Sequence, residues 1–354
     1  MKAARIVIGA GGTAGHVVPA LAVADALRAE GAEVTFVGGD RAELELVPAA
    51  GYELRTLRVM PLPRGRPLKA ARAALVAGAA VREARRIVRE LRPAAVLSGG
   101  GYVAGPVGLA AVLSRVPLVL TEADSHLGLT NRLLVPFARR VCLAFPIEGR
   151  HGSRYVVTGR PVPAPATDWQ AARERFGIGL RESCVLVFGG SQGARSINRA
   201  AVDAFAGARF HVLHAAGERD LRDLEDLQAP GPHYDLRGYI PKFGEALLAS
   251  DLVVARAGGS IFEIAAHGKP AVLVPYPYAT ADHQSANARF MERAGAAVVI
   301  PDSELTPARL ANEVGRLLAD RGRLAAMGRA SAALARRDAA RDIAHEVLAA
   351  AGKR

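Results

Sequence analysis

The feature that most constrains the fold is a short hydrophobic run that ends in a glycine-rich turn and continues into a helical stretch. The chain carries this feature twice, as RIVIGAGGTAGHVVPALA from residue 5 and as CVLVFGGSQGARSINRA from residue 184. A β-rich run, a tight turn and a helix are typical of the βαβ unit of a parallel sheet, whose crossover is right-handed. We therefore predict an α/β protein with two Rossmann-like, doubly wound parallel-sheet domains.

Further hydrophobic runs extend both predicted sheets, and helical segments separate them. These strands are predicted at 95–98, 117–121, 210–214, 252–255 and 271–275. The last stretch of the chain, 323–352, is rich in Ala and Arg and predicts a helix.

The segment TGRPVPAPATDW, residues 158–169, separates the two repeats. Its prolines cannot continue a strand or a helix, so we place the interdomain linker there. The expected N-terminal domain covers 1–161 and the expected C-terminal domain covers 162–337. A C-terminal helix over 338–354 is expected to pack back on the first domain.

Composition narrows the choice of partners. The chain has 354 residues, of which 50% are hydrophobic, and a formal net charge of +12. The length suits two domains, and the charge favours anionic partners such as phosphorylated substrates, acidic lipid head groups or nucleic acid. Aromatic residues make up only 5% and no stacking motif accompanies the basic residues, which argues against nucleic acid.

Three features bear on the compartment. Cys142 and Cys184 each lie in a hydrophobic run, which predicts buried thiols in a reducing environment rather than a disulfide. The N-terminal hydrophobic run ends in glycines and shows no signal-peptide pattern. Residues 93–114 carry no charge and could span a bilayer by length, but their prolines and glycines favour a buried strand, a glycine loop and a helix.

Three glycine-rich turns follow predicted strands, at Gly9–Gly15, Gly99–Gly101 and Gly189–Gly193. Glycine lets the backbone approach an oxyanion, and the free N–H groups of the next helix lie at the positive end of its dipole. Phosphate is the expected ligand, although such turns also serve as simple tight connections. The first turn also fits a GxGxxA dinucleotide fingerprint with Asp40 as the ribose acid, which leaves an NAD-dependent oxidoreductase as an alternative.

A fourth turn, Gly258–Ser260, precedes a short predicted helix that carries Glu263. The carboxylate of Glu263 could hold a ribose diol, or it could simply complement the helix dipole. The loop after the next strand adds polar groups suited to sugar hydroxyls, where open α/β sheets bind ligands. These groups are Asp282, His283, Gln284 and Asn287. Adjacent side chains such as Asp282 and His283 rarely face one ion, so no metal site is expected.

His16 follows the first glycine turn, where a neutral imidazole could accept a proton from an incoming hydroxyl, although a lone histidine is more often structural. No GxSxG turn, P-loop lysine or CxxC pair points to hydrolase, NTPase or redox chemistry.

Residues 64–90 combine Arg64, Arg66, Lys69 and Arg72 with a hydrophobic stretch that includes Leu68, Leu75 and Val76. This pattern indicates an interfacial membrane contact. The alternative is an ordinary helix that packs Leu75 and Val76 into the core and leaves its arginines in solvent.

Six segments together resemble the MurG family of glycosyltransferases (glycosyltransferase family 28) in order and spacing. They read GGTAGHVVPALAVADAL, LSGGGYVAGPVGLAA, GLTN, GGSQGARSIN, EIAAHGKPAVLVPYP and DHQSANA. The resemblance implies a GT-B fold and inverting transfer of N-acetylglucosamine from UDP-N-acetylglucosamine to the C4 hydroxyl of lipid I. The product would be lipid II for peptidoglycan, and hence for cell shape and division, and no cofactor is implied.

The resemblance also implies a location and individual roles. The enzyme would work at the cytoplasmic face of the plasma membrane as a peripheral protein, on an anionic surface and with other cell-wall synthesis proteins as partners. His16 would assist deprotonation of the acceptor. Implied acceptor-binding residues are Gly100, Gly101, Tyr102 and Asn131. Implied donor-binding residues are Thr13, Ala14, Gly15, Asp124, Arg160, Ser191, Gln192, Ile240, Gly258, Gly259, Ser260, Glu263, His283 and Gln284.

The chain departs from the family pattern in places. Asp124 stands where an Asn associated with donor contact is usual, and Pro163 stands where an Arg is usual, with Arg160 three positions earlier as a possible replacement. The RAGGSIFE turn is also about one residue shorter than the usual form. Because of these departures, one alternative is a catalytically impaired relative of the family that binds its ligand without transferring a sugar. Another alternative, which the expected fold also allows, is a different GT-B enzyme that acts on UDP-sugars, such as a UDP-N-acetylglucosamine 2-epimerase.

Overall fold

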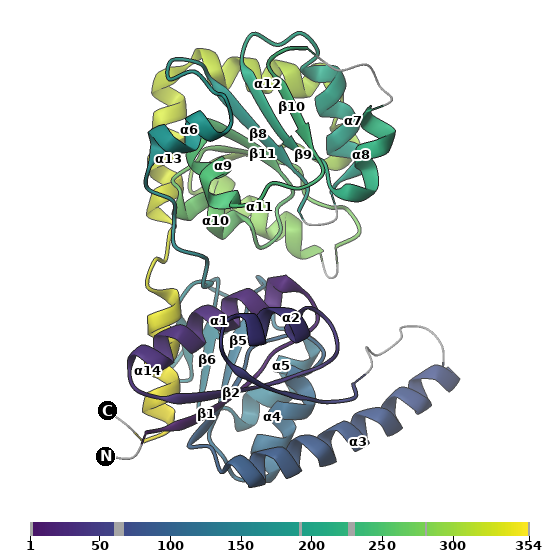
Figure 1. Ribbon diagram of the computed structural model, residues 1–354, viewed down its shortest axis with the longest axis vertical. Helices are drawn as coiled ribbons and strands as arrows, with labels where there is room; N and C mark the ends of the chain where they lie inside the picture. Colours follow the sequence, from purple (N-terminus) through teal and green to yellow (C-terminus); the bar gives the residue numbers. More distant parts are fainter. Residues whose placement is uncertain (1–2, 60–66, 191–192, 226–230, 280–281, 353–354) are drawn as a thin grey trace. The chain divides into compact units, whose positions relative to one another are not determined.

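The computed structural model describes residues 3–59, 67–190, 193–225, 231–279 and 282–352, with the backbone alone for 67–77 and 225. The chain forms two compact units (Figure 1). Unit 1 comprises residues 1–163 and 336–354, and unit 2 comprises residues 164–335. Each unit is built on its own parallel sheet, so the predicted fold class is confirmed.

Unit 1 contains a seven-stranded sheet in the order β3-β2-β1-β4-β5-β6-β7. Its strands are β1 (Arg5–Gly9), β2 (Glu33–Gly38), β3 (Glu53–Thr56), β4 (Ala95–Ser98), β5 (Leu118–Glu122), β6 (Arg140–Leu143) and β7 (Tyr155–Val157). Its helices are α1 (Ala14–Ala29), α2 (Ala42–Ala49), α3 (Pro67–Leu91), α4 (Ala104–Leu113), α5 (Leu129–Leu134), the 3-10 helix η1 (Val135–Phe137) and α14 (Ala339–Ala350). The uncharged segment 93–114 is thus a strand, a glycine loop and a helix, as predicted.

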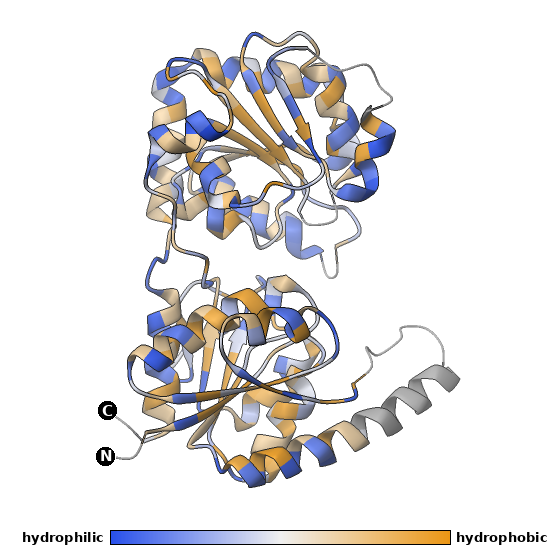
Figure 2. Cartoon of the chain, viewed as in Figure 1, coloured by the Kyte–Doolittle hydropathy of each residue, from blue (hydrophilic) through white to orange (hydrophobic). Residues whose placement is uncertain are grey.

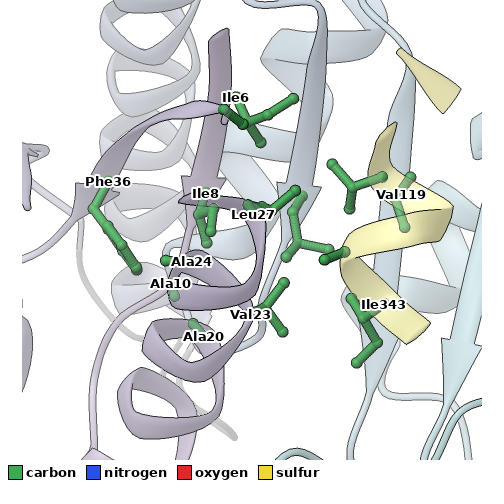
Figure 3. Packing of buried hydrophobic residues seen from close by; sticks show 14 of the residues in the cluster. Ile6, Ile8, Ala10, Ala20, Val23, Ala24, Leu27, Phe36, Val119 and Ile343 are labelled. Carbon is green, nitrogen blue, oxygen red and sulfur yellow. The ribbon is translucent and has the colours of Figure 1, made fainter. Parts of the chain in front are cut away.

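The two faces of this sheet follow from the alternation of side chains along its strands. Ile6 and Ile8 of β1 point to the face that α1 and α14 cover, whereas Val7 points to the face covered by α3 and α4. Figure 3 shows the first face, where Leu27 of α1 and Ile343 of α14 belong to the same buried cluster. Because both faces are covered, the strands are hydrophobic runs rather than alternating ones.

Unit 2 contains a six-stranded parallel sheet in the order β10-β9-β8-β11-β12-β13. Its strands are β8 (Cys184–Phe188), β9 (His211–Ala215), β10 (Tyr234–Arg237), β11 (Leu252–Ala255), β12 (Ala271–Leu273) and β13 (Ala297–Val299). Its helices are α6 (Trp169–Arg175), α7 (Arg195–Ala204), α8 (Glu218–Glu225), α9 (Phe243–Ala249), α10 (Ile261–Ala266), α11 (His283–Arg293), η3 (Asp302–Glu304), α12 (Pro307–Ala319) and α13 (Arg321–Ala333). Figure 2 shows that the central strands are hydrophobic along their length.

The single helix expected over 323–352 is wrong. The structure has two helices there, α13 in unit 2 and α14 in unit 1. The chain passes from one unit to the other between them, and Asp338 precedes the first turn of α14. Ala and Arg favour helix throughout this stretch, so tertiary packing rather than local propensity sets the break. Cys142 and Cys184 are free and buried, as predicted, and burial raises the pKa of both thiols.

Candidate functional site

The order of the sheet in unit 1 reverses between β1 and β4, and the loops at the carboxyl ends of these two strands meet there. Such a reversal is where open α/β sheets bind ligands. Thr13 is the N-cap of α1 and makes no side-chain capping bond, and the first turn holds no acidic residue. The N–H groups of this turn, which includes Ala14 and Gly15, are therefore well suited to an anion.

The glycine loop after β4 lies directly against the loop after β1. The N–H of Gly99 donates to the carbonyl of Gly9 at 2.8 Å. A Cβ on Gly101, which has a φ of +79°, would lie 1.9 Å from the carbonyl oxygen of Gly11. A Cβ on Gly12 would lie 3.2 Å from the ring of Tyr102. The predicted residues Gly101 and Tyr102 are thus brought next to the turn that begins α1.

His16 lies in the first turn of α1 and faces this loop. A Cβ on Gly100 would stand 2.8 Å from His16 Nδ1, so only glycine fits at that position without displacing the ring. Burial lowers the pKa of His16, and the charge of Arg160 lowers it further, while the carboxylate of Asp124 raises it. The imidazole is consequently neutral at pH 7 and is able to accept a proton.

Arg160 and His16 line the same cavity of unit 1, whose volume is about 30 Å³. The guanidinium of Arg160 donates to the carbonyl of Gly15 at 2.6 Å, which holds its charge at the start of α1. Its lining also includes the buried hydrophobic side chains of Val23, Leu97 and Ile343. The cavity therefore offers both polar and hydrophobic surface to a ligand.

The loop after β5 is organised by the buried carboxylate of Glu122. This group accepts hydrogen bonds from the N–H groups of Gly128 at 2.8 Å and Asp124 at 3.2 Å, and from the side-chain amide of Asn131 at 2.9 Å. Burial raises the pKa of Glu122, although these three donors oppose the shift. Asn131 also donates to the carbonyl of Thr121. The amide nitrogen of Asn131 is thus engaged in holding the loop.

In unit 2 the order of the sheet likewise reverses, between β8 and β11. The glycine turn after β8 leads to α7, which has no side-chain capping bond at Ala194 and no acidic residue in its first turn. Gly193 has a φ of +71°, and a Cβ there would lie 1.9 Å from the carbonyl oxygen of Ala216. Ser191 and Gln192, predicted to bind the donor, lie outside the described residues.

The other predicted donor-side residues gather at the carboxyl ends of β11 and β12. Gly258, Gly259 and Ser260 form the turn into α10, and Glu263 lies in the first turn of that helix. A Cβ on Gly258 would lie 3.8 Å from Gln284 Nε2, so this turn and Gln284 are neighbours. Gln284 Oε1 accepts from the N–H of Tyr276 at 2.9 Å, which fixes the orientation of the amide.

The last two predicted donor-side residues, His283 and Ile240, differ in their position in unit 2. His283 is the first residue of α11, next to Gln284. Ile240 follows β10 and its side chain is 1% exposed. Ile240 is therefore a core residue of unit 2.

Arg256 is a buried residue of this edge that sequence reasoning did not single out. Its guanidinium donates to the carbonyl of Val274, to Asp302 at 2.6 Å and to the hydroxyl of Ser196 at 2.7 Å. These bonds tie together the ends of β11 and β12, η3 and the start of α7. The sequence shows only an Arg after a hydrophobic run, which gives no sign of burial.

A second buried network supports α7. The amide nitrogen of Asn198 donates to the carbonyl of Ala216 at 2.8 Å and to Asp220, so its oxygen must accept from His214 Nε2. His214 Nδ1 then accepts the hydroxyl proton of Tyr234 at 2.9 Å. Burial lowers the pKa of His214 to about 4, which keeps this tautomer neutral. The network fixes α7 beside the turn at Gly193.

The described parts of the chain contain neither a membrane-spanning helix nor a metal-binding cluster. None of the helices there combines the length and hydrophobicity that a bilayer crossing needs. No cluster of three or more His, Cys, Asp or Glu side chains in the same ranges is arranged to hold a metal ion.

Comparison with known proteins gives consistent matches over both units. The models of the glycosyltransferase family 28 N-terminal and C-terminal domains match residues 6–143 and 184–344. A protein of Methylococcus capsulatus named UDP-N-acetylglucosamine–N-acetylmuramyl-(pentapeptide) pyrophosphoryl-undecaprenol N-acetylglucosamine transferase is 42% identical over 357 residues, covering 99% of each chain. A protein of the same name from Moorella thermoacetica is 41% identical over 364 residues, covering 97% of this chain and 98% of the relative.

Solved structures also match nearly the whole of this chain. The crystal structure of Acinetobacter baumannii MurG has a TM-score of 0.79 and 29% identity, and the match covers 98% of this chain and 100% of that one. A putative UDP-N-acetylglucosamine 2-epimerase from Listeria monocytogenes has a TM-score of 0.74 at 15% identity, with 98% and 96% covered. At that identity the second likeness reports the shared fold alone.

Proposed function

Because this chain belongs to glycosyltransferase family 28, we propose that it transfers N-acetylglucosamine from UDP-N-acetylglucosamine to the N-acetylmuramyl-pentapeptide of pyrophosphoryl-undecaprenol, forming lipid II for peptidoglycan. The observation that carries the proposal is the 42% identity, over nearly the whole of both chains, to a transferase named for this reaction. The chain is a glycosyltransferase with the GT-B architecture of MurG.

The chemistry proposed is a single inverting displacement. The C4 hydroxyl oxygen of the acceptor forms a bond to C1 of the donor sugar, the bond from C1 to the phosphate oxygen breaks, and UDP leaves with the electron pair. His16 Nδ1 or Nε2 takes the hydroxyl proton, in keeping with its neutral state. Helix N-termini stabilise the charge on the departing diphosphate.

The acceptor is assigned to unit 1, and the donor is assigned mainly to unit 2. Unit 1 would bind the lipid-linked acceptor through the loops that carry Gly100, Gly101 and Tyr102, with Asn131 as support for the neighbouring loop. Unit 2 would bind the nucleotide sugar. There Glu263 would hold the ribose, Gln284 and His283 the sugar hydroxyls, Ile240 the uracil, and Gly258–Ser260 with Ser191 and Gln192 the diphosphate. These unit 2 assignments rest on family motifs and on the clustering at the carboxyl ends of β11 and β12.

Three residues at the start of α1 and two further positions, Asp124 and Arg160, complete the proposed donor contacts. Thr13, Ala14 and Gly15 offer backbone N–H groups, and Arg160 adds a positive charge beside them. Asp124 places a carboxylate near His16 where the family has an amide, and Pro163 lacks the usual charge. We infer that Arg160 offsets both departures, because its charge and that of Asp124 act on the same imidazole with opposite sign.

The decisive experiment supplies pure protein with UDP-N-acetylglucosamine and a lipid I analogue. We expect UDP release that depends on the acceptor, together with a disaccharide lipid detected by mass spectrometry. Donor incubated alone serves as the control, and formation of the manno epimer there would identify an epimerase. Absence of turnover with substrates that a known MurG converts would refute the proposal.

A peripheral attachment to the cytoplasmic face of the plasma membrane is proposed from an exposed hydrophobic surface on unit 1. Leu109 and Leu113 on α4 are 39% and 47% exposed, and Leu129, Leu133 and Phe137 on α5 and η1 are 60–66% exposed. The i, i+4 spacing places each set on one side of its helix, and α4 and α5 are in contact. Arg115, Arg132 and Arg139 are exposed close by in sequence, which suits anionic head groups. The contact predicted from Arg64, Arg66, Lys69, Arg72, Leu68, Leu75 and Val76 lies outside the described side chains.

Replacing both Leu129 and Leu133 by serine is expected to weaken binding to phosphatidylglycerol vesicles by roughly tenfold or more, because two exposed leucines lose the chance to bury in the acyl region. Cosedimentation measures this directly. Leu180→Ser is the matched control, since Leu180 is 53% exposed on unit 2 and should not affect binding. Equal binding by the double variant and the wild type would exclude this surface as the attachment site.

A further inference from the structure

Glu43 is a fully buried carboxylate that the proposed reaction does not use. It lies in the first turn of α2, and its exposed fraction is 0%. Its Oε2 accepts from the N–H of Gly12 at 2.8 Å, and its Oε1 accepts from the N–H of Gly39 at 2.7 Å. The hydroxyl of Tyr102 lies 3.4 Å from Oε1 and 3.3 Å from Asp40 Oδ1. One side chain therefore connects the loops after β1, β2 and β4.

The surrounding backbone is shaped to admit this carboxylate. A Cβ on Gly11 would lie 2.5 Å from Glu43 Oε1, and a Cβ on Gly38 would lie 2.8 Å from Glu43 Cγ. A Cβ on Gly39 would lie 2.9 Å from Glu43 Oε1 and 2.3 Å from the Tyr102 hydroxyl oxygen. Glycine at these positions lets two loops approach the carboxylate closely.

The loops that Glu43 joins are the ones that present the proposed acceptor site. The loop after β1 leads directly to Thr13 and His16, and the loop after β4 carries Gly100 to Tyr102. A carboxylate that accepts from backbone N–H groups forms charge-assisted bonds, which are stronger than neutral ones. We propose that Glu43 is a positioning residue that holds these loops in the geometry for acceptor binding and for proton transfer to His16. The inference rests on the proposed function and deepens it.

Glu43→Gln is a sharp test because it preserves shape and removes one acceptor. A glutamine side chain offers one oxygen and one NH₂ group, so one of the two backbone N–H groups would face another donor. We expect kcat/KM for the lipid-linked acceptor to fall about 10- to 100-fold, while the affinity for UDP, measured by calorimetry, falls by a smaller factor because the proposed unit 2 contacts stay intact. Glu45→Gln is the matched control, since Glu45 lies in the same turn, carries the same charge and is exposed.

A purely structural role would give a different pattern. Loss of folded protein lowers the maximal rate but leaves the acceptor KM and the pH profile unaltered. Displaced loops would raise the acceptor KM and speed amide hydrogen exchange in peptides covering 9–13 and 38–40. Unchanged acceptor KM and unchanged exchange in a folded Glu43→Gln variant would overturn the proposal.

A second variant perturbs the hydrogen bonds of Glu43 through Gly39, which is not one of the proposed ligand contacts. Gly39→Ala introduces a methyl group against both Tyr102 and Glu43, so the same rise in acceptor KM is expected. Gly78→Ala in α3 is its control, because no described atom outside its own helix turn lies within 4 Å of that Cβ. If Glu43→Gln fails to fold by circular dichroism, Gly39→Ala decides: a raised KM supports the proposal and an unchanged KM overturns it. Should the wild type transfer no sugar, the proposed function fails, whereas the exchange measurement still tests Glu43.

Discussion

Replacing His16 by glutamine is expected to lower kcat by about 10²- to 10⁴-fold, the usual contribution of a general base. Burial keeps the imidazole neutral, and the loop at Gly100 packs against Nδ1, so the ring is held in one place with its basic form populated. Glutamine retains hydrogen-bonding capacity but cannot accept the proton at neutral pH. Steady-state kinetics with UDP-N-acetylglucosamine and a lipid I analogue measure the change.

The controls separate catalysis from binding. His151→Gln removes an exposed histidine of the same unit and should leave kcat within about twofold of the wild type. The His16 variant should still bind UDP with wild-type affinity, because the proposed nucleotide contacts of unit 2 are intact. A kcat reduced less than tenfold would rule out His16 as the base.

The same histidine should set the acidic limb of the pH profile. Its pKa is lowered from 6.5, chiefly by burial, so the folded enzyme keeps the neutral ring to lower pH than a free histidine does. The limb of kcat/KM is therefore expected below pH 6.5. Since the unfolded chain protonates first, His16 lowers the free energy of unfolding as the pH falls from 6.5 through the folded pKa. Both effects should be missing from the glutamine variant.

Replacing Gly193 by alanine is expected to weaken UDP binding by about 10- to 100-fold. An alanine in this left-handed conformation costs about 1–2 kcal/mol, and its methyl group would also lie 1.9 Å from the carbonyl oxygen of Ala216. The backbone cannot keep its path, so the N–H groups at the start of α7 would move away from the diphosphate. Displacements near 1 Å have effects of this size. Isothermal calorimetry with UDP measures the loss.

Gly207→Ala provides the comparison that isolates this contact. Gly207 also has a positive φ, +69°, but no described atom other than those of its chain neighbours lies within 4 Å of a Cβ there. That variant should lose some thermal stability from backbone strain and bind UDP normally. Equal UDP affinity in the two variants would show that the turn at Gly193 does not contact the nucleotide.

The elements and the positions of the turns could be predicted because they depend on local signals. Runs such as CVLVF must be buried on both faces, and glycines with positive φ, such as Gly12 and Gly100, mark where strands end and helices begin. The arrangement of both sheets then follows from chirality and short connections. Because of this topology, the four glycine turns lie at the carboxyl ends of neighbouring strands, β1 and β4 in one sheet and β8 and β11 in the other.

The groups that hold the site together could not be predicted, since they depend on contacts between distant residues. Glu43 and Glu45 look alike in sequence, both in the first turn of α2, yet one is buried and the other exposed. Asn131 suggested a ligand contact, whereas its amide nitrogen donates to Thr121 and Glu122. The break between α13 and α14 has only one local signal, Asp338 as a helix N-cap, because no proline or glycine lies between them.

The position of α14 has a consequence for how the protein is made. Ile343, Ala344 and Val347 of this helix belong to the same buried cluster as Ile8 and Leu27, although the whole of unit 2 lies between them along the chain (Figure 3). Unit 1 therefore cannot complete its core until unit 2 and then α14 have been translated, and one hydrophobic face stays uncovered until then. A product truncated before α14 would keep this face as an open, aggregation-prone surface.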